Sequence, residues 1–190
     1  MTSHGRSETR HRRSLRLPEY EYSQVGAYFI TVCATSRECL FGEVVDGEML
    51  LNEAGRIVQA IWHRLSNRFA NVELDALVVM PNHVHAVITI VDGTDVGAGL
   101  ALPGGEAAGG TANLRPTTLG DIVGAFKSLS AINVNRLLVR SGPVRQRNYY
   151  EHIIRDETSL NRIRDYIAIN PSQWHLDTEN PERRKSIGET

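Results

Sequence analysis

The sequence predicts an α+β fold in which helices pack on one face of an antiparallel sheet. The first observation is length, because 190 residues are enough for one domain with its own core and few for two. The second is the alternation of apolar, β-branched runs with segments whose apolar residues recur at helical spacing. The third is Asp46-Gly47, a turn signal that indicates a hairpin and therefore antiparallel strands.

Five segments have the composition of strands, with many β-branched and aromatic residues. They span residues 27–35, 41–45, 48–51, 72–80 and 83–91. Asp46-Gly47 joins the second segment to the third, and Pro81-Asn82 separates the fourth from the fifth. A shorter extended piece is expected at 144–152, after the break at Ser141-Gly142-Pro143.

Three segments are expected to be helices. A helix over 53–68 begins after the N-cap residue Asn52, and a second helix over 119–138 begins after Thr118. A third helix over 157–170 ends at Pro171, because the residue before a proline avoids the helical conformation. The second helix is expected to bury Ile122, Phe126, Leu129 and Ile132.

The chain divides into a basic N-terminal arm at 1–16, a single domain at 17–174 and a C-terminal tail at 175–190. Residues 93–110 contain seven glycines, so that 93–115 is expected to form a flexible loop. The arm holds five arginines, Arg12 and Arg13 among them, against one acidic residue. Such an arm suits a polyanion such as nucleic acid, and a solvated tail is the alternative.

Composition excludes several classes of protein. Hydrophobic residues make up 41% and charged residues 23% of the chain, which is typical of a soluble globular protein. The apolar runs are too short to cross a bilayer, and no apolar segment follows the basic arm, as it would in a secretory signal. Two cysteines, Cys33 and Cys39, form no disulfide framework, so a cytoplasmic location is expected.

The most informative motif is Pro81-Asn82-His83-Val84-His85, which lies within an apolar, β-branched run. Side chains alternate between the two faces of a strand, so His83 and His85 point the same way. Two neutral imidazoles on one face provide half of a divalent-metal site if a third ligand arrives from another element. A pair of solvated or hydrogen-bonded histidines is the alternative at this point.

Tyr166 and Asn170 lie four residues apart in the last expected helix, on one face and about one turn from each other. A phenol can attack phosphorus and become a phosphotyrosine, provided that a metal neutralises the charge that develops on the phosphate. The amide oxygen of Asn170 would complete a site with His83 and His85, and these mixed ligands suit Mn²⁺ or Mg²⁺. Packing by Tyr166 and helix capping by Asn170 is the alternative.

Four motifs, in this order, resemble those of the REP-associated tyrosine transposases, which belong to the single-tyrosine HUH transposases. They are Pro81-Asn82-His83-Val84-His85, Gly124-Ala125-Phe126-Lys127-Ser128, the run 146–157, and Tyr166-Ile167-Ala168-Ile169-Asn170-Pro171. The resemblance covers roughly residues 12–175. It implies a ferredoxin-like, RRM-like domain that cuts and rejoins single-stranded DNA, often at imperfect hairpins. One position departs from the pattern, because Arg145 stands where the family usually has tryptophan.

The resemblance also implies roles for individual residues. His83 and His85 match the metal ligands, Tyr166 the nucleophile and Asn170 the polar ligand one turn later. Tyr149 and Tyr150 match an extended segment of the family, where base stacking or core packing suits them better than catalysis. Independently of the resemblance, phosphate contacts with DNA are expected from Arg12 and Arg13 of the basic arm and from Lys127, Arg147 and Arg155. An ordinary solvated surface is the alternative for the last three.

Together these patterns predict a Mg²⁺- or Mn²⁺-dependent single-strand DNA endonuclease and strand-transferase that acts on hairpin DNA through a 5′-phosphotyrosine intermediate. One alternative is a DNA-hairpin-binding module without catalysis. Another is a metal-dependent phosphohydrolase that needs His83 and His85 but forms no covalent intermediate. The expected partner is single-stranded or hairpin DNA rather than a membrane, and the protein is expected to be a monomer or a homodimer.

Overall fold

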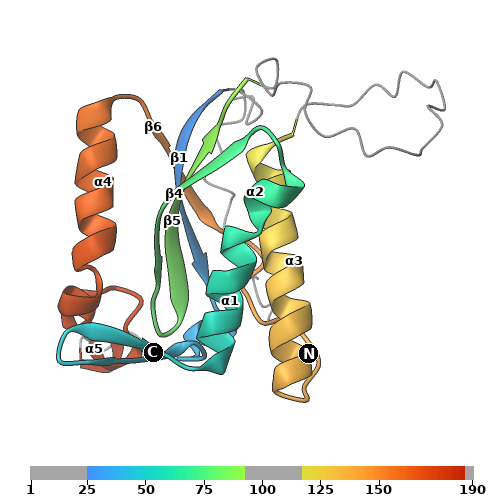
Figure 1. Ribbon diagram of the computed structural model, residues 1–190. Helices are drawn as coiled ribbons and strands as arrows, with labels where there is room; N and C mark the ends of the chain where they lie inside the picture. The colour runs from blue at the N-terminus through green and yellow to red at the C-terminus, as the bar shows by residue number, and fades with distance from the viewer. Residues whose placement is uncertain (1–24, 93–116, 187–190) are drawn as a thin grey trace, which may run out of the picture.

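A four-stranded antiparallel sheet with the strand order β4-β5-β1-β6 forms the centre of the molecule (Figure 1). The strands are β1 (Gly26–Cys33), β4 (Val72–Val79), β5 (His83–Ile90) and β6 (Tyr150–Ile154). The computed structural model describes residues 25–92 and 117–186. The arm predicted at 1–16 and the loop predicted at 93–115 therefore lie outside the described residues.

A two-stranded hairpin, β2 (Gly42–Val45) and β3 (Glu48–Leu51), stands apart from this sheet. Its turn residues Asp46 and Gly47 both have positive φ angles, 51° and 81°, as a two-residue turn matched to the strand twist requires. The predicted hairpin is confirmed. A Cβ atom added at Gly47 would lie 3.4 Å from Ser172, so the turn also lies against a segment from the C-terminal part of the chain.

One face of the sheet is covered by α1 (Glu53–His63) and α3 (Leu119–Leu137), as the sequence predicted, and the short α2 (Leu65–Arg68) follows α1. The Asn52 side chain accepts a hydrogen bond from the Gly55 amide, and Thr118 forms a capping box with Asp121. Both predicted N-caps are thus confirmed. Ile132 is 53% exposed, so the prediction that it is buried is wrong. The buried stripe instead continues from Phe126 through Ser130 and Val134.

The opposite face carries α4 (Glu157–Ile169), which is where the structure departs from the expectation that helices cover one face only. Figure 1 shows the sheet between α4 on one side and α1 with α3 on the other. A small apolar cluster of Phe29, Val87, Ile154 and Ile167 joins α4 to the strands. The α+β class with its antiparallel sheet is confirmed, and it becomes a three-layer arrangement with the sheet in the middle.

After α4 the chain continues as the 3₁₀ helix η3 (Pro171–Leu176) and the short helix α5 (Pro181–Ser186). Residues 175–190 were predicted to form a tail. In the structure, residues 177–180 return to the end of the sheet, where Asn180 is buried and the backbone carbonyl of Glu179 accepts a hydrogen bond from Asn82. Among the described residues, no helix is long and apolar enough to cross a membrane.

Candidate metal and tyrosine site

Strand β5 places His83 and His85 side by side on the face of the sheet that α4 covers. It pairs with β1 on one side and β4 on the other, and Cys33 and Thr31 of β1 lie opposite His83 and His85. The His83 side chain is 0% exposed and that of His85 is 5% exposed. Their Nε2 atoms are 3.0 Å apart. The sequence prediction that both rings point the same way is therefore correct, and a solvated surface pair is excluded.

Asn82 fixes the orientation of the His83 ring. Its Nδ2 donates to the carbonyl oxygens of Arg37 and Glu179, at 3.0 and 2.8 Å. Carbonyl groups only accept hydrogen bonds, so Oδ1 is the amide atom that lies 2.9 Å from His83 Nδ1. This oxygen can only accept, which places the ring proton of neutral His83 on Nδ1. The Nε2 lone pair of His83 consequently faces His85.

The His85 ring is held by Thr31 and Phe29 of β1. Thr31 Oγ1 lies 2.8 Å from His85 Nδ1, and the Phe29 ring stacks on the imidazole with a centroid distance of 5.3 Å. A hydroxyl group both donates and accepts, so Thr31 supports either tautomer of His85. With its proton on Nδ1, His85 would present a second Nε2 lone pair toward that of His83. This is the arrangement in which two imidazoles bind a single cation.

Burial keeps both imidazoles uncharged. It lowers the pKa of His83 to about 3, and burial together with the neighbouring His83 lowers the pKa of His85 to about 3. A protonated imidazole cannot bind a metal. The two rings therefore remain available as ligands throughout the physiological pH range.

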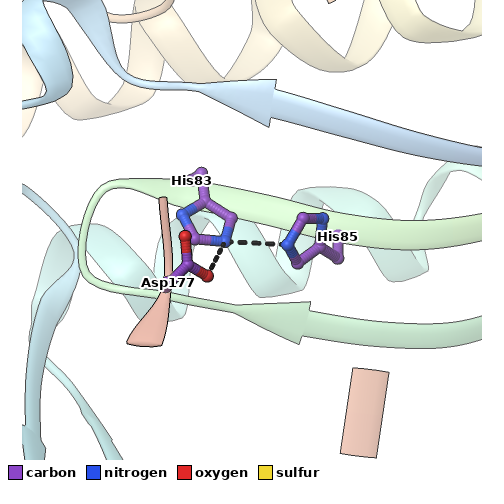
Figure 2. A group of neighbouring side chains, drawn as sticks. All are labelled: His83, His85 and Asp177. Carbon is purple, nitrogen blue, oxygen red and sulfur yellow. Dashed lines mark hydrogen bonds and ion pairs between the residues drawn. The ribbon is translucent and has the colours of Figure 1, made fainter. Parts of the chain in front are cut away.

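Asp177 brings a carboxylate to this pair of rings (Figure 2). Its Oδ2 atom lies 3.7 Å from His83 Nε2, and one potential ligand atom from each of the three residues lies within 4.8 Å of the others. Asp177 is not among the residues predicted for the site, because it lies in the segment that was expected to be a tail. No motif or spacing in the sequence connects Asp177 with the histidines.

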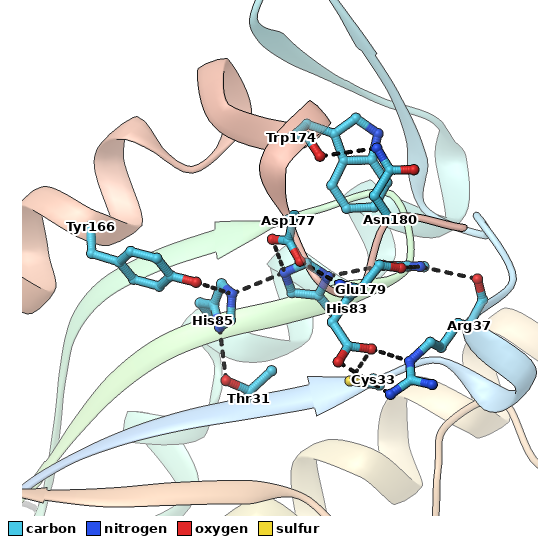
Figure 3. A network of polar contacts seen from close by, with 11 residues as sticks. Thr31, Cys33, Arg37, His83, His85, Tyr166, Trp174, Asp177, Glu179 and Asn180 are labelled. Carbon is cyan, nitrogen blue, oxygen red and sulfur yellow. Dashed lines mark hydrogen bonds and ion pairs between the residues drawn. The ribbon is translucent and has the colours of Figure 1, made fainter. Parts of the chain in front are cut away.

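Contacts of Glu179 hold the Asp177 segment in place (Figure 3). The Glu179 carboxylate forms an ion pair with Arg37 and accepts a hydrogen bond of 3.6 Å from the Cys33 thiol. Burial, followed by the charge of Glu179, raises the pKa of Cys33 to about 12. The Cys33 thiol therefore stays protonated at neutral pH, and Cys33 and Cys39 are free thiols in the structure.

The side chain of Tyr166, which belongs to α4, also contacts the His85 ring. Its hydroxyl group lies 3.3 Å from His85 Nε2, and its ring meets Phe29 edge to face. The side chain is 44% exposed, so an incoming ligand can reach it. Burial, followed by the charge of Asp177, raises the pKa of Tyr166, and a hydrogen bond with Asn170 opposes that rise.

Asn170, which follows the last residue of α4, is 4% exposed. Its Oδ1 atom is buried and has no hydrogen-bond partner. A buried amide oxygen without a partner is uncommon in proteins. Such an oxygen can coordinate a cation, or it can accept a hydrogen bond from a bound molecule. Tyr166 therefore contacts both Asn170 and His85, and His85 in turn contacts His83.

The residues expected to contact DNA do not gather at this point. Lys127, Arg147 and Tyr149 line a hollow beside α3, on the other side of the sheet. Tyr150 lies nearer the histidines, edge to face with Phe29 and 46% exposed. Arg155 is exposed just beyond β6. Arg12 and Arg13 lie outside the described residues.

The donor set fits a divalent cation. It comprises two neutral imidazole nitrogens and the Asp177 carboxylate, whose potential ligand atoms lie within 4.8 Å of one another. A mixed set of nitrogen and oxygen ligands with room for further oxygens is typical of Mn²⁺ and related ions.

Comparison with known proteins agrees with this reading of the fold. A solved REP-associated tyrosine transposase, bound to a REP hairpin, is similar with a TM-score of 0.56 and 18% identity, over 85% of this chain and 75% of that one. The chain therefore shares the fold of this REP-associated tyrosine transposase, as its motifs predicted. An uncharacterised protein of Haemophilus influenzae is 39% identical over 186 residues, which are 93% of this chain and 97% of the relative. The chain belongs to the same family as this protein. No family model matches it.

Proposed function

We propose that this protein is a metal-dependent single-strand DNA endonuclease and strand-transferase that acts on hairpin DNA through Tyr166. The observation that carries the proposal is that the Tyr166 hydroxyl lies 3.3 Å from His85 Nε2. The same His85 atom lies 3.0 Å from Nε2 of the second imidazole, His83. A nucleophile beside a set of cation ligands is what phosphoryl transfer to a side chain requires. The REP hairpin in the structurally similar transposase supports hairpin DNA as the substrate.

In the proposed reaction the Tyr166 oxygen forms a bond to phosphorus and the bond from phosphorus to the 3′ oxygen breaks. The phenol proton ends on the 3′ oxygen, which leaves a free 3′-hydroxyl and a 5′-phosphotyrosine. Reversal with a second 3′-hydroxyl rejoins the strand without another energy source. When bound, Mg²⁺ or Mn²⁺ would neutralise charge on the phosphate and make phosphorus easier to attack.

We assign the cation to His83, His85 and Asp177, with Asn170 as a further oxygen ligand. Asn82 and Thr31 orient the two rings. Tyr150, which is exposed beside Phe29, is suited to stack on a base next to the reacting phosphate. The basic arm with Arg12 and Arg13 and the exposed Arg155 would add contacts with phosphates.

The test is a denaturing gel of the protein mixed with a labelled hairpin oligonucleotide in Mn²⁺. Wild-type protein should give a covalent band, and Tyr166→Phe should bind the hairpin equally well but give none. Tyr150→Phe is the matched control, since it also removes one phenol oxygen, and it should retain the band.

Free cleaved product without a covalent band would favour a phosphohydrolase, and binding without either would favour a module that lacks catalysis. A covalent band from Tyr166→Phe that disappears in Tyr150→Phe would assign the nucleophile to Tyr150. Cleavage that persists in excess EDTA would remove the cation from the proposal.

A further inference from the structure

A basic hollow lies on the side of the sheet away from the histidines. A hollow of about 450 Å³ opens between α3 and the segment that leads into β6. We call it the α3 hollow, and the residues that line it include Gly120, Gly124, Lys127, Arg145, Arg147 and Tyr149. Three of its lining residues are cationic and none carries a carboxylate. This local excess of positive charge contrasts with the net charge of −1 for the whole chain.

Arg145 is the unusual member of this set. Its side chain is 5% exposed and lies between two phenyl rings, with its guanidinium carbon 5.0 Å from the Phe41 centroid and 4.7 Å from the Phe126 centroid. All three guanidinium nitrogens are buried without a hydrogen-bond partner. Arg145 also forms no ion pair with any residue in 25–92 or 117–186. The aromatic faces favour a cation, but they do not supply the acceptors that a guanidinium requires.

A buried charge without a counter-charge is unfavourable, even when its packing is good. Burial lowers the pKa of Arg145 to about 9, so the guanidinium still carries its charge at neutral pH. An anion in the adjoining hollow would supply the missing negative charge. Two further cations stand there, because Arg147 is exposed and Lys127 donates a 2.7 Å hydrogen bond to the Arg147 carbonyl.

Helix α3 leaves space for an anion at this point. Gly120 and Gly124 lie one turn apart on the same face of the helix, toward the hollow. A Cβ atom added at Gly124 would meet no atom within 4 Å, so packing inside the protein does not require a glycine there. Glycine is unfavourable in the interior of a helix. A glycine at this exposed position leaves the helix surface bare, so that a ligand in the hollow can approach it closely.

We propose that the α3 hollow binds a phosphate group, with Arg145 as its buried positive charge and Lys127 and Arg147 as direct contacts. That the phosphate belongs to the backbone of hairpin DNA rests on the proposed function. A free phosphate is the other source of the same group, and the two arms of the test distinguish them. The site lies on the opposite face from Tyr166, so it would hold DNA at a distance from the reacting phosphate.

The key variants are Arg145→Met, which keeps an unbranched side chain between the phenyl rings, and the pair Gly124→Gln and Gly124→Glu. The members of that pair have nearly the same size and differ in charge, and both project from an exposed position where folding is not at risk. Arg136→Met, an exposed substitution on α3 outside the hollow, is the matched control.

Hairpin binding is measured in EDTA by fluorescence anisotropy at several salt concentrations. Melting is measured in phosphate and in chloride at equal ionic strength.

We expect Arg145→Met to weaken hairpin binding about tenfold and to reduce the salt slope by up to about one unit, because one positive charge beside the bound phosphate is lost. Gly124→Glu should weaken binding more than Gly124→Gln, and Arg136→Met should resemble wild type. A different result would assign a free phosphate to the site. In that case phosphate raises the melting temperature of the wild type but not that of Gly124→Glu, and the variants bind the hairpin as the wild type does. Unchanged binding, salt slope and phosphate response in Arg145→Met and in both Gly124 variants would overturn the proposal.

The covalent-band assay separates this proposal from the proposed function. A wild-type covalent band together with indifferent Gly124 variants would leave the function standing and remove the phosphate site. Weaker hairpin binding by Gly124→Glu than by Gly124→Gln, without any covalent band, would support the phosphate site and remove the proposed function.

Discussion

At the scale of single residues, two asparagines near the histidine pair use their side-chain amides in different ways. Asn82 uses its whole amide to hold the turn and to direct the His83 lone pair toward His85. Asn170 leaves its buried oxygen without a partner beside Tyr166. One amide is therefore fully satisfied and orients a ligand, whereas the other is free to act as a ligand.

Replacing Asp177 with asparagine tests the third ligand. The change keeps the size of the side chain and removes its charge, so we expect Mn²⁺ affinity to fall about 10- to 100-fold. Isothermal titration calorimetry without DNA measures this directly. Glu182→Gln, an exposed acid a few residues later, should bind Mn²⁺ as wild type does. Unchanged affinity in Asp177→Asn with loss in Asn170→Ala would transfer the role to Asn170.

At the scale of elements, α4 carries the nucleophile and is attached to the sheet at few points. Ile167 is 3% exposed and packs with Phe29 and Val87, and Arg164 forms two hydrogen bonds, of 3.0 and 2.5 Å, with the Asp75 carboxylate of β4. The place of Tyr166 next to His85 depends on these contacts. Loss of these contacts would move Tyr166 away from the histidine pair without altering Tyr166 or the histidines themselves.

Ile167→Ala should therefore affect both stability and chemistry. The cavity should lower the free energy of unfolding by about 3 kcal/mol, measured by urea denaturation, and covalent-band formation should slow. Ile169→Ala removes the same atoms from the same helix, but Ile169 is 46% exposed. It should change stability by no more than about 0.5 kcal/mol. Equal losses in the two variants would show that Ile167 does not fasten α4 to the sheet.

The sequence predicted the parts of the site that depend on local spacing. The two-residue period of a strand brings His83 and His85 together, and the four-residue spacing of a helix brings Tyr166 near Asn170. Turn and capping residues such as Asp46-Gly47, Asn52 and Thr118 likewise act on their immediate neighbours. These predictions held because each one involves residues within a single element.

Contacts between distant segments were not predictable in this way. Asp177 reaches His83 because Glu179 is paired with Arg37 and Asn82 binds the Glu179 carbonyl. None of these pairs has a recognisable sequence spacing. The placement of α4 on the far face also depends on long-range packing, because its apolar stripe would fit either face of the sheet. The resemblance to a known family, rather than any periodicity, connected Tyr166 with the histidines.

At the scale of the whole molecule, the sheet separates two kinds of surface. The face under α4 carries the neutral histidines and the tyrosine, and the face under α1 and α3 carries the main core and the basic hollow. Burial of two uncharged imidazoles ties the stability of the entire domain to pH. Unfolding releases both rings to water, where the ordinary pKa of histidine is about 6.5.

Below that value the unfolded chain binds protons that the folded protein, with histidine pKa values of about 3, excludes. Stability is thus fully present above pH 6.5 and declines as the pH falls toward 3. Each histidine contributes about 1.4 kcal/mol per pH unit within this window. In EDTA, the free energy of unfolding should fall by about 4 kcal/mol between pH 7 and pH 5.

Variants of single histidines show whether the decline comes from the buried pair. His85→Gln removes one titrating ring and should reduce the fall between pH 7 and pH 5 to about 2 kcal/mol. His63→Gln removes an exposed histidine of α1 and should leave the fall unchanged, because that ring meets water in both states. A wild-type free energy that stays level over this range would mean that His83 and His85 accept protons within the folded protein. The pair would then be charged near pH 6, and cation binding would weaken over the same interval.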